Sequence, residues 1–141
     1  MVSHQRGLGI NYWITTGNEA DISVSEAIQF LAEDEKVHTI MAYVESVKDG
    51  KMFTKALDTA RQEKKPVILM KVGRSDVGAA AANSHTASLA GEDAIYSEVI
   101  RAHGAYRVRS TEEMLDVAYA TKPRIYPSGK NLGIVTISGG G

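Results

Sequence analysis

Two side chains in this sequence of 141 residues have the types and positions that phosphoryl chemistry needs. His85 lies in NSHTASLAGED, residues 83–93, among side chains too small to cover an imidazole. A neutral histidine is a good nitrogen nucleophile and can carry a group covalently. Glu45 ends an apolar run, and a carboxylate bonded to the other ring nitrogen would leave the attacking lone pair free. A solvated loop histidine is the alternative interpretation of His85.

Alternating strand and helix patterns must position these two residues. Apolar residues recur at helical spacing, as in Val24, Ile28 and Leu31, and alternate with short runs rich in β-branched residues. Ser23 with Glu26 and Ser110 with Glu113 have the spacing of capping boxes. We expect strands at 10–16, 38–45, 66–73, 105–110 and 131–137, and helices at 23–34, 51–63, 92–104 and 110–121.

This alternation predicts an α/β fold with a parallel sheet and right-handed crossovers. The expected architecture is flavodoxin-like and three-layered, with about five strands in the order 2-1-3-4-5 and helices on both faces. Trp13, the only tryptophan, is expected in the core. Residues 1–121 are expected to form this domain and 122–130, with two prolines and one glycine, a linker. Residues 131–141 then form a truncated first strand and Gly-rich loop of a following domain.

The strand ends gather further candidates at one edge, because ligands of open parallel sheets bind beyond the carboxyl ends of the strands. The connection 74–91, which contains His85, is much longer than the usual 2 to 6 residues and consists mostly of alanine, glycine and serine. Its backbone N–H groups and hydroxyls suit a phosphoryl group. Lys71 and Arg74 flank a glycine and could hold an anion. The candidate phosphate-binding or loop-binding residues are Gly17, Asn18, Gly73, Arg74, Ser84 and Thr86.

Composition narrows the class of protein. Sixteen basic and seventeen acidic side chains nearly cancel, so neither nucleic acid nor an anionic membrane is an expected partner. No apolar run approaches the roughly 18 residues of a membrane span. Cysteine is absent and the N-terminus lacks a signal segment, from which we expect a cytoplasmic protein. No metal-ligand spacing is present, and His4, His38 and His103 are interpreted as solvated or structural.

Four motifs resemble a known family. TTGNEAD (15–21), YVESVKDG (43–50), PVILMKVGRS (66–75) and SHTASLAGED (84–93) occur in the same order and spacing in the ADP-forming acyl-CoA synthetases. These enzymes, the acetate–CoA ligases, are relatives of the succinyl-CoA synthetase alpha chain. The resemblance extends over residues 7–138 and identifies the chain as similar to the ligase-CoA domain of that family.

The resemblance implies an activity and roles for two residues. The family interconverts acyl-CoA, ADP and phosphate with a carboxylic acid, ATP and CoA. Its phosphorylated histidine corresponds to His85, and the glutamate that supports the phosphohistidine corresponds to Glu45. Ala87 stands where the family usually has glycine, which would stiffen the loop slightly.

The resemblance also implies partners. The parent enzyme would contain a CoA-binding Rossmann-like domain and an ATP-grasp domain, and would use CoA, ADP or ATP, Mg²⁺ and a small acid. We expect no cofactor bound in this domain itself and no turnover by the domain alone. The acyl group, the choice of ATP or GTP and self-association stay open.

Three other functions stay open at this point. One is a ligand-sensing regulatory domain of a CoA-ligase-like protein acetyltransferase that has lost ligase chemistry. Retention of both Glu45 and His85 argues against it. The second is a plain interaction module, and the third, from fold alone, is flavin binding.

Overall fold

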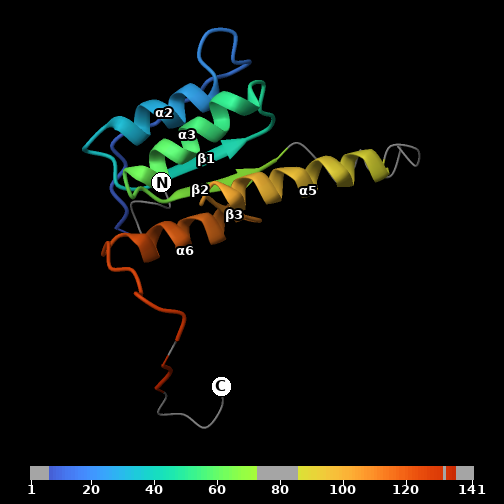
Figure 1. Ribbon diagram of the computed structural model, residues 1–141. Helices are drawn as coiled ribbons and strands as arrows, with labels where there is room; N and C mark the ends of the chain where they lie inside the picture. The colour runs from blue at the N-terminus through green and yellow to red at the C-terminus, as the bar shows by residue number, and fades with distance from the viewer. Residues whose placement is uncertain (1–6, 73–85, 132, 136–141) are drawn as a thin grey trace.

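Three parallel strands form the centre of the described structure (Figure 1). The computed structural model describes residues 7–72, 86–131 and 133–135, with only the backbone for 86–92. Within this part, β1 (Ile40–Val44), β2 (Val67–Lys71) and β3 (Tyr106–Val108) lie in the order β1-β2-β3. Both neighbouring pairs are parallel, as the alternation of elements predicted.

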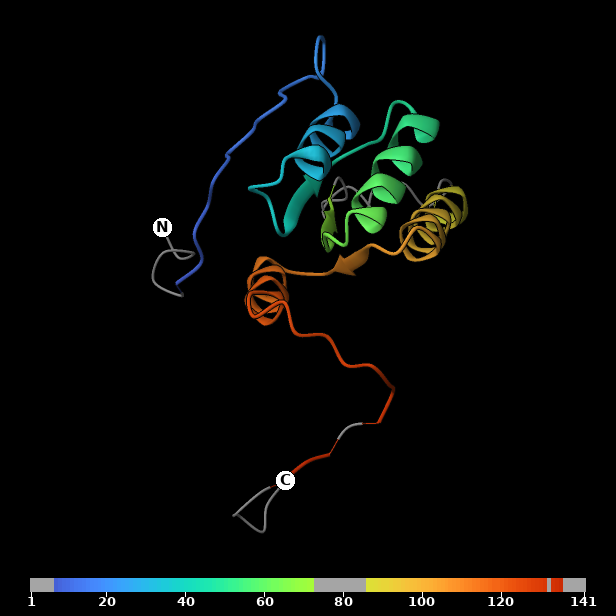
Figure 2. The same ribbon diagram turned by 60° about the vertical axis from the view of Figure 1, so that its left-hand side comes forward.

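Helices cover both faces of this sheet, as Figures 1 and 2 show. The helices of the described residues are α2 (Val24–Glu33), α3 (Gly50–Gln62), α5 (Thr86–Ala102) and α6 (Thr111–Thr121). Helices α2 and α3 pack together over one face, and α5 lies beside α3 on that side. Helix α6 packs against β2 and β3 on the opposite face.

Side-chain caps decide where three of these helices begin. Ser23 and Glu26 form the predicted capping box, in which each side chain accepts from the other residue's backbone N–H. At α6, Ser110 accepts from the backbone N–H of Glu113 at 3.1 Å. Asp49 caps α3 by accepting from the backbone N–H groups of Lys51 and Met52, the second and third residues of that helix.

Two apolar clusters hold the layers together, one on each face of the sheet. Along β1, burial alternates, so that Ile40, Ala42 and Val44 point into the cluster shared with α2, α3 and α5. The cluster on the other face joins β2 and β3 to α6 and comprises Ile68, Val108, Met114 and Ala118. Met41 and Tyr43 of β1 also point to that second face, where both are exposed.

Residues 10–16 do not form the expected strand. They run as an extended trace that joins no described strand (Figure 2). The prediction that Trp13 is buried is wrong, because 72% of this residue is exposed. A β-branched pattern is realised as a strand only where a neighbouring strand supplies the pairing, and none pairs with this segment in the described part of the chain.

The expected strand order also differs from the structure. The order 2-1-3-4-5 places residues 10–16 between the strands of 38–45 and 66–73, but β1 pairs directly with β2. The sequence pattern carries no signal of which apolar runs become neighbours. Of the expected strand 131–137, residues 131 and 133–135 are described and form no strand, and Ile134 and Val135 are exposed.

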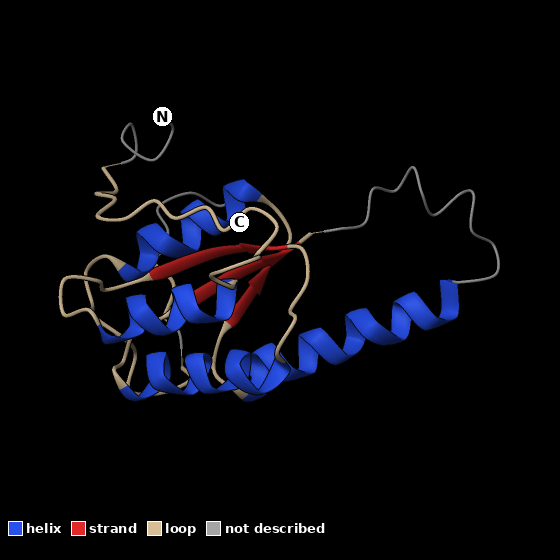
Figure 3. Cartoon of the chain, turned by 90° about the horizontal axis from the view of Figure 1, so that it is seen from above, coloured by secondary structure: helices blue, strands red, loops and turns tan. Residues whose placement is uncertain are grey.

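Helix α5 is longer than expected, since it begins at Thr86 rather than at Glu92. Alanine and leucine in TASLAG favour helix enough to extend it by these residues. Its first turns project beyond the carboxyl ends of the strands (Figure 3). Among the described helices, none combines the length and the apolar character that crossing a membrane requires.

Candidate functional site

Glu45 lies where the sequence placed it, directly after β1 at the carboxyl edge of the sheet. The residue is exposed, and no described group hydrogen-bonds to its carboxylate. Its backbone carbonyl accepts a hydrogen bond from the Lys71 ammonium, which also donates to the carbonyl of Val72 at 2.8 Å. The main chain at Glu45 is therefore fixed by the end of β2, while its carboxylate is available to another partner.

Tyr96 of α5 reaches the same edge. Its hydroxyl oxygen accepts a hydrogen bond from the backbone N–H of Val47 at 3.3 Å, two residues beyond Glu45. The Lys71 ammonium lies 5.0 Å from the centre of the Tyr96 ring, within the range of a cation–π interaction. The exits of β1 and β2 are thus both joined to α5 through one aromatic side chain.

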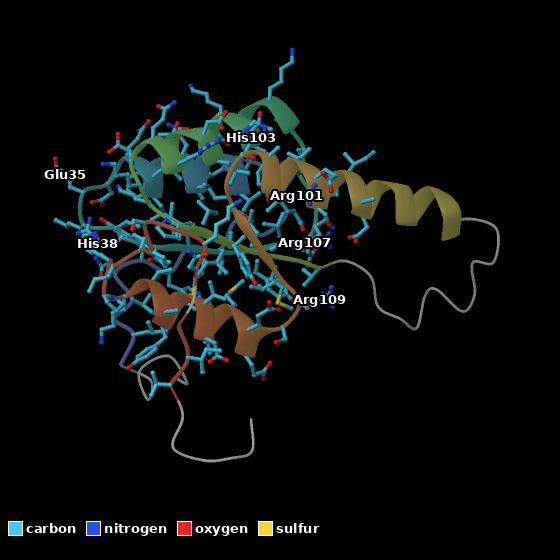
Figure 4. The ribbon with its side chains drawn as sticks, turned by 60° about the horizontal axis from the view of Figure 1, so that its bottom comes forward. Glu35, His38, Arg101, His103, Arg107 and Arg109 are labelled. Carbon is cyan, nitrogen blue, oxygen red and sulfur yellow. The ribbon has the colours of Figure 1, made fainter. Side chains whose placement is uncertain are left out.

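Arg107 fixes α5 to the third strand. Its guanidinium donates to both carboxylate oxygens of Asp93, at 2.6 and 3.2 Å, and to the Asp93 carbonyl at 3.1 Å. It also donates to the Ser97 hydroxyl at 2.5 Å. The guanidinium is half-buried and lies between β3 and α5 (Figure 4). A planar fork with several partners holds a helix in one orientation better than a point charge does.

The histidine half of the predicted pair lies outside the described residues. The structure does not describe His85, nor the predicted residues Gly73, Arg74 and Ser84. The predicted contact between His85 and Glu45 therefore stays a prediction. The backbone of Thr86 is described and begins α5. Since Thr86 precedes Tyr96 by ten positions, it lies ~15 Å along the helix axis from the tyrosine that meets Val47.

The predicted residues Gly17 and Asn18 lie in a turn that approaches the carboxyl end of β1. Gly17 has a φ of 55°, which glycine adopts without strain. The Lys48 ammonium donates to the carbonyls of Asn18 and Glu19 at 2.7 and 2.9 Å. Asn18 also lines a shallow hollow of about 320 Å³ that extends from Ile14 to Ile22. Gly17, Asn18 and Glu45 therefore share one edge, and a phosphate-binding role for the turn stays a prediction.

The other described histidines are distant from this edge or already paired. His103 ends α5 and its Nδ1 lies 2.8 Å from Asp58 Oδ1 of α3, which is a structural contact between helices. His38 is exposed before β1, with Glu35 close to it and the projecting turns of α5 at the far end of the molecule (Figure 4). Within the described residues, no group of three or more acidic, histidine or cysteine side chains could hold a metal ion.

Sequence reasoning missed three residues that organise this edge. Tyr96 carries a signal, because it shares a helix face with Ile100 at a spacing of four, but nothing in that pattern indicates a bond to Val47. For Arg107, the sequence pattern predicts only an ordinary outward-facing residue of a short strand. Lys48 follows β1 by a few residues and has no pattern that predicts its two carbonyl partners.

Comparison with known proteins decides the family. The model of the succinyl-CoA ligase-like flavodoxin domain matches residues 2–121. The chain belongs to this family. The family that the four motifs indicated is thereby confirmed.

Several relatives of this ligase-like domain are ADP-forming CoA ligases. The chain is 39% identical over 135 residues to the alpha subunit of acetate–CoA ligase [ADP-forming] I of Pyrococcus furiosus. The aligned region covers 94% of this chain and 29% of that subunit. It is 38% identical over 136 residues to the 4-hydroxybutyrate–CoA ligase [ADP-forming] of Nitrosopumilus maritimus, covering 96% of this chain and 20% of the relative. The Methanocaldococcus jannaschii acetate–CoA ligase [ADP-forming] is 37% identical over 135 residues, with 94% and 19% covered. The chain thus spans less than a third of each relative.

Proposed function

We propose that this domain carries a phosphoryl group on His85 within an ADP-forming acyl-CoA synthetase, and that Glu45 supports the phosphorylated ring. Family membership over residues 2–121 supports the enzyme class. The observation that carries the proposal is the exposed carboxylate of Glu45, which no described group binds, at the same sheet edge from which α5 projects. That helix begins at Thr86, the residue directly after His85 in the sequence.

The chemistry is a pair of phosphoryl transfers. In the first, a ring nitrogen of His85 attacks the phosphorus of an acyl phosphate, so that a P–N bond forms while the P–O bond to the acyl group breaks. The carboxylate leaves with the bonding electron pair. In the second, a terminal phosphate oxygen of ADP attacks phosphorus and the P–N electrons return to the imidazole, which yields ATP.

Glu45 would act through the other ring nitrogen. A carboxylate that accepts its N–H fixes the tautomer whose lone pair attacks. The phosphorylated ring is a cation while it keeps that N–H proton, so the Glu45 charge also stabilises the intermediate. When phosphorus leaves, the neutral ring is restored without a net gain or loss of protons.

Unwinding of the first turns of α5 would let the segment that carries His85 reach Glu45. With Thr86 ~15 Å along the axis from Tyr96, a ring at position 85 must fold back toward β1 to meet the carboxylate. Gly91 lies within this part of α5, and glycine inside a helix costs about 1 kcal/mol relative to alanine. Unwinding of 86–91 is therefore less costly than for an alanine-only helix, and the contacts of Asp93 and Tyr96 hold the rest of α5 in place.

The other reactants belong to the rest of the parent enzyme in this proposal. CoA would bind to a Rossmann-like domain, and ADP or ATP with Mg²⁺ to an ATP-grasp domain, as the family resemblance implies. The names of the relatives include acetate and 4-hydroxybutyrate as acids.

Phosphorylation of the parent enzyme tests the proposal. Incubation with γ-labelled ATP and Mg²⁺ should give a protein-bound phosphoryl group that is labile in acid and stable in base. The His85→Asn variant should retain no label, while His38→Asn, at the opposite edge, should be labelled like the wild type. Label that persists in His85→Asn would show that another residue carries the phosphoryl group.

A further inference from the structure

A hollow lies at the amino edge of the sheet, where the strands begin, opposite to the edge that carries Glu45. Its volume of about 470 Å³ is within the range of pockets that hold small molecules. Pro66 precedes β2 and Gly104 precedes β3, so the hollow lies where two neighbouring strands start. The other residues that line it are Arg61, Lys64, Lys65, Arg124 and Tyr126.

Four of the side chains that line this hollow are cationic, and none is acidic. Elsewhere in the described structure a cation of this kind is neutralised, as Arg107 is by Asp93. By contrast, no described carboxylate forms an ion pair with Arg61, Lys64 or Arg124. Like charges gathered without a counter-charge create a positive potential that attracts an anion.

The fold holds two of the four cations in place. The Lys65 ammonium donates to the carbonyls of Ala32 and Asp34, at 2.6 and 2.7 Å, where α2 ends. The side chain of Arg61 lies against Gly104, where an added Cβ would be only 3.1 Å from Arg61 Cδ. Glycine at position 104 therefore leaves the room that Arg61 occupies beside the start of β3.

The other two cations, Lys64 and Arg124, occupy positions where glycine would suit the backbone better. Both residues have a φ of 55°, a left-handed conformation that is uncommon for residues with a side chain. Lys64 follows the end of α3, and its N–H donates to the Arg61 carbonyl at 3.1 Å. Glycine is the usual residue directly after a helix in this conformation. The fold alone does not favour long cationic side chains there, which points to a function.

Tyr126 adds an aromatic ring to the cationic hollow. The residue is exposed, and in the described part of the chain neither another ring nor a cation packs on its face. Nucleotide bases of any identity stack on such a ring. Guanidinium groups bind phosphate oxygens through two parallel hydrogen bonds. The lining therefore suits a ligand that joins phosphates to an aromatic base.

We propose that this hollow binds a nucleoside diphosphate or triphosphate. Its phosphates would contact Arg61, Lys64 and Arg124, and its base would stack on Tyr126. The five residues of β2 span ~17 Å between the two edges of the sheet, so a nucleotide bound here is remote from the Glu45 carboxylate. The site binds its ligand without making or breaking a bond, and the proposal does not depend on phosphoryl transfer.

Photolabelling of the parent enzyme tests the proposal. The probe is ADP that carries an azide on its adenine, used without Mg²⁺, and the label is located by peptide mass spectrometry. The peptide of residues 125–130, which contains Tyr126, should be labelled saturably. ADP should compete with the probe at least about tenfold better than pyrophosphate, because stacking of the base adds to the phosphate contacts. Absence of label from this peptide, or equal competition by pyrophosphate, would overturn the proposal.

Lys64→Gly separates binding from folding, because glycine adopts a φ of 55° without strain. This variant should unfold at the same denaturant concentration as the wild type or a higher one. Its half-saturating probe concentration should nevertheless rise by about tenfold, since one charged phosphate contact is lost. Lys55→Gln removes an exposed cation of α3 outside the hollow and should be labelled like the wild type. Wild-type labelling of both Lys64→Gly and Arg61→Gln would overturn the proposal.

Discussion

The hydroxyl of Tyr96 and the backbone N–H of Val47 lie 3.3 Å apart and join α5 to the segment that follows β1. This bond connects the helix that begins after His85 with the strand exit that carries Glu45. Lys71 strengthens the same junction by contacting both the Tyr96 ring and the Glu45 carbonyl. The ends of β1 and β2 and helix α5 therefore form one connected unit at this edge.

Removing the Tyr96 hydroxyl should weaken this junction while leaving the aromatic ring in place. Tyr96→Phe keeps the ring over Lys71 but leaves the Val47 N–H without its partner, which should lower the free energy of unfolding by about 1 kcal/mol. Tyr96→Leu also removes the cation–π contact and should cost more. Denaturant unfolding of the domain measures both, and equal stability of Tyr96→Phe and wild type would show that the bond contributes nothing.

The half-buried pair of Arg107 and Asp93 should be coupled. Arg107→Lys keeps the charge but loses the bidentate fork, and Asp93→Asn removes the carboxylate charge. A double-mutant cycle by equilibrium unfolding should give a coupling of about 1 kcal/mol, since the Asp93 side chain is 44% exposed and partly screened. The exposed pair of Arg101 and Glu98 is the matched control and should show a smaller coupling.

The contact between Tyr12 and Asp34 predicts a pH dependence for residues 10–16. The hydrogen bond from the Tyr12 hydroxyl lowers the pKa of Asp34 and raises the pKa of Tyr12. The lowered pKa of Asp34 gives stability that is present above about pH 4 and lost as pH falls. The raised pKa of Tyr12 gives stability that is present below about pH 10 and lost as pH rises.

Trp13 reports this behaviour because it is adjacent to Tyr12 and exposed. Its fluorescence should change in two steps, one on acidification and one at high pH, before the domain itself unfolds. Tyr12→Phe should abolish the change in Trp13 fluorescence between mid-range and acidic pH. An unchanged acid transition in Tyr12→Phe would mean that another group holds the segment.

Elements whose pattern is local could be predicted from the sequence. Helices α2, α3 and α6 begin within one residue of their predicted starts because Ser23, Asp49 and Ser110 cap them. Strands β1, β2 and β3 lie inside the predicted ranges because their apolar runs match buried strands. The start of α5 was missed because alanine-rich sequence has no cap that marks where helix replaces loop.

Which strands pair with one another could not be predicted from local sequence patterns. The run around Trp13 has a strand composition, but a strand requires a neighbour, and neighbours are a property of the whole sheet. The position of Glu45 followed from strand direction alone and is confirmed. The contacts of Tyr96 and Arg107 depend on how α5 lies across three strands, which no local pattern determines.

Neutralising Glu45 should affect the intermediate more than the fold. Glu45→Gln keeps the shape and the exposed position, so the unfolding free energy should stay within about 0.5 kcal/mol of the wild type. The phosphohistidine level of the parent at steady state should fall by about tenfold or more, since the ring loses its charge partner. Glu35→Gln, exposed at the opposite edge, is the control and should be phosphorylated normally. Equal labelling of both variants would remove Glu45 from the mechanism.

The central claim is that the imidazole at position 85 carries the phosphoryl group, and locating that group by mass spectrometry tests it most directly. The parent enzyme would be phosphorylated with ATP and Mg²⁺, digested at neutral pH or above, and its peptides sequenced by a fragmentation method that preserves the P–N bond. We predict a phosphoryl group on His85 in the peptide that contains SHTASLAGED. A phosphoryl group found only on another residue, with this peptide unmodified, would contradict the account.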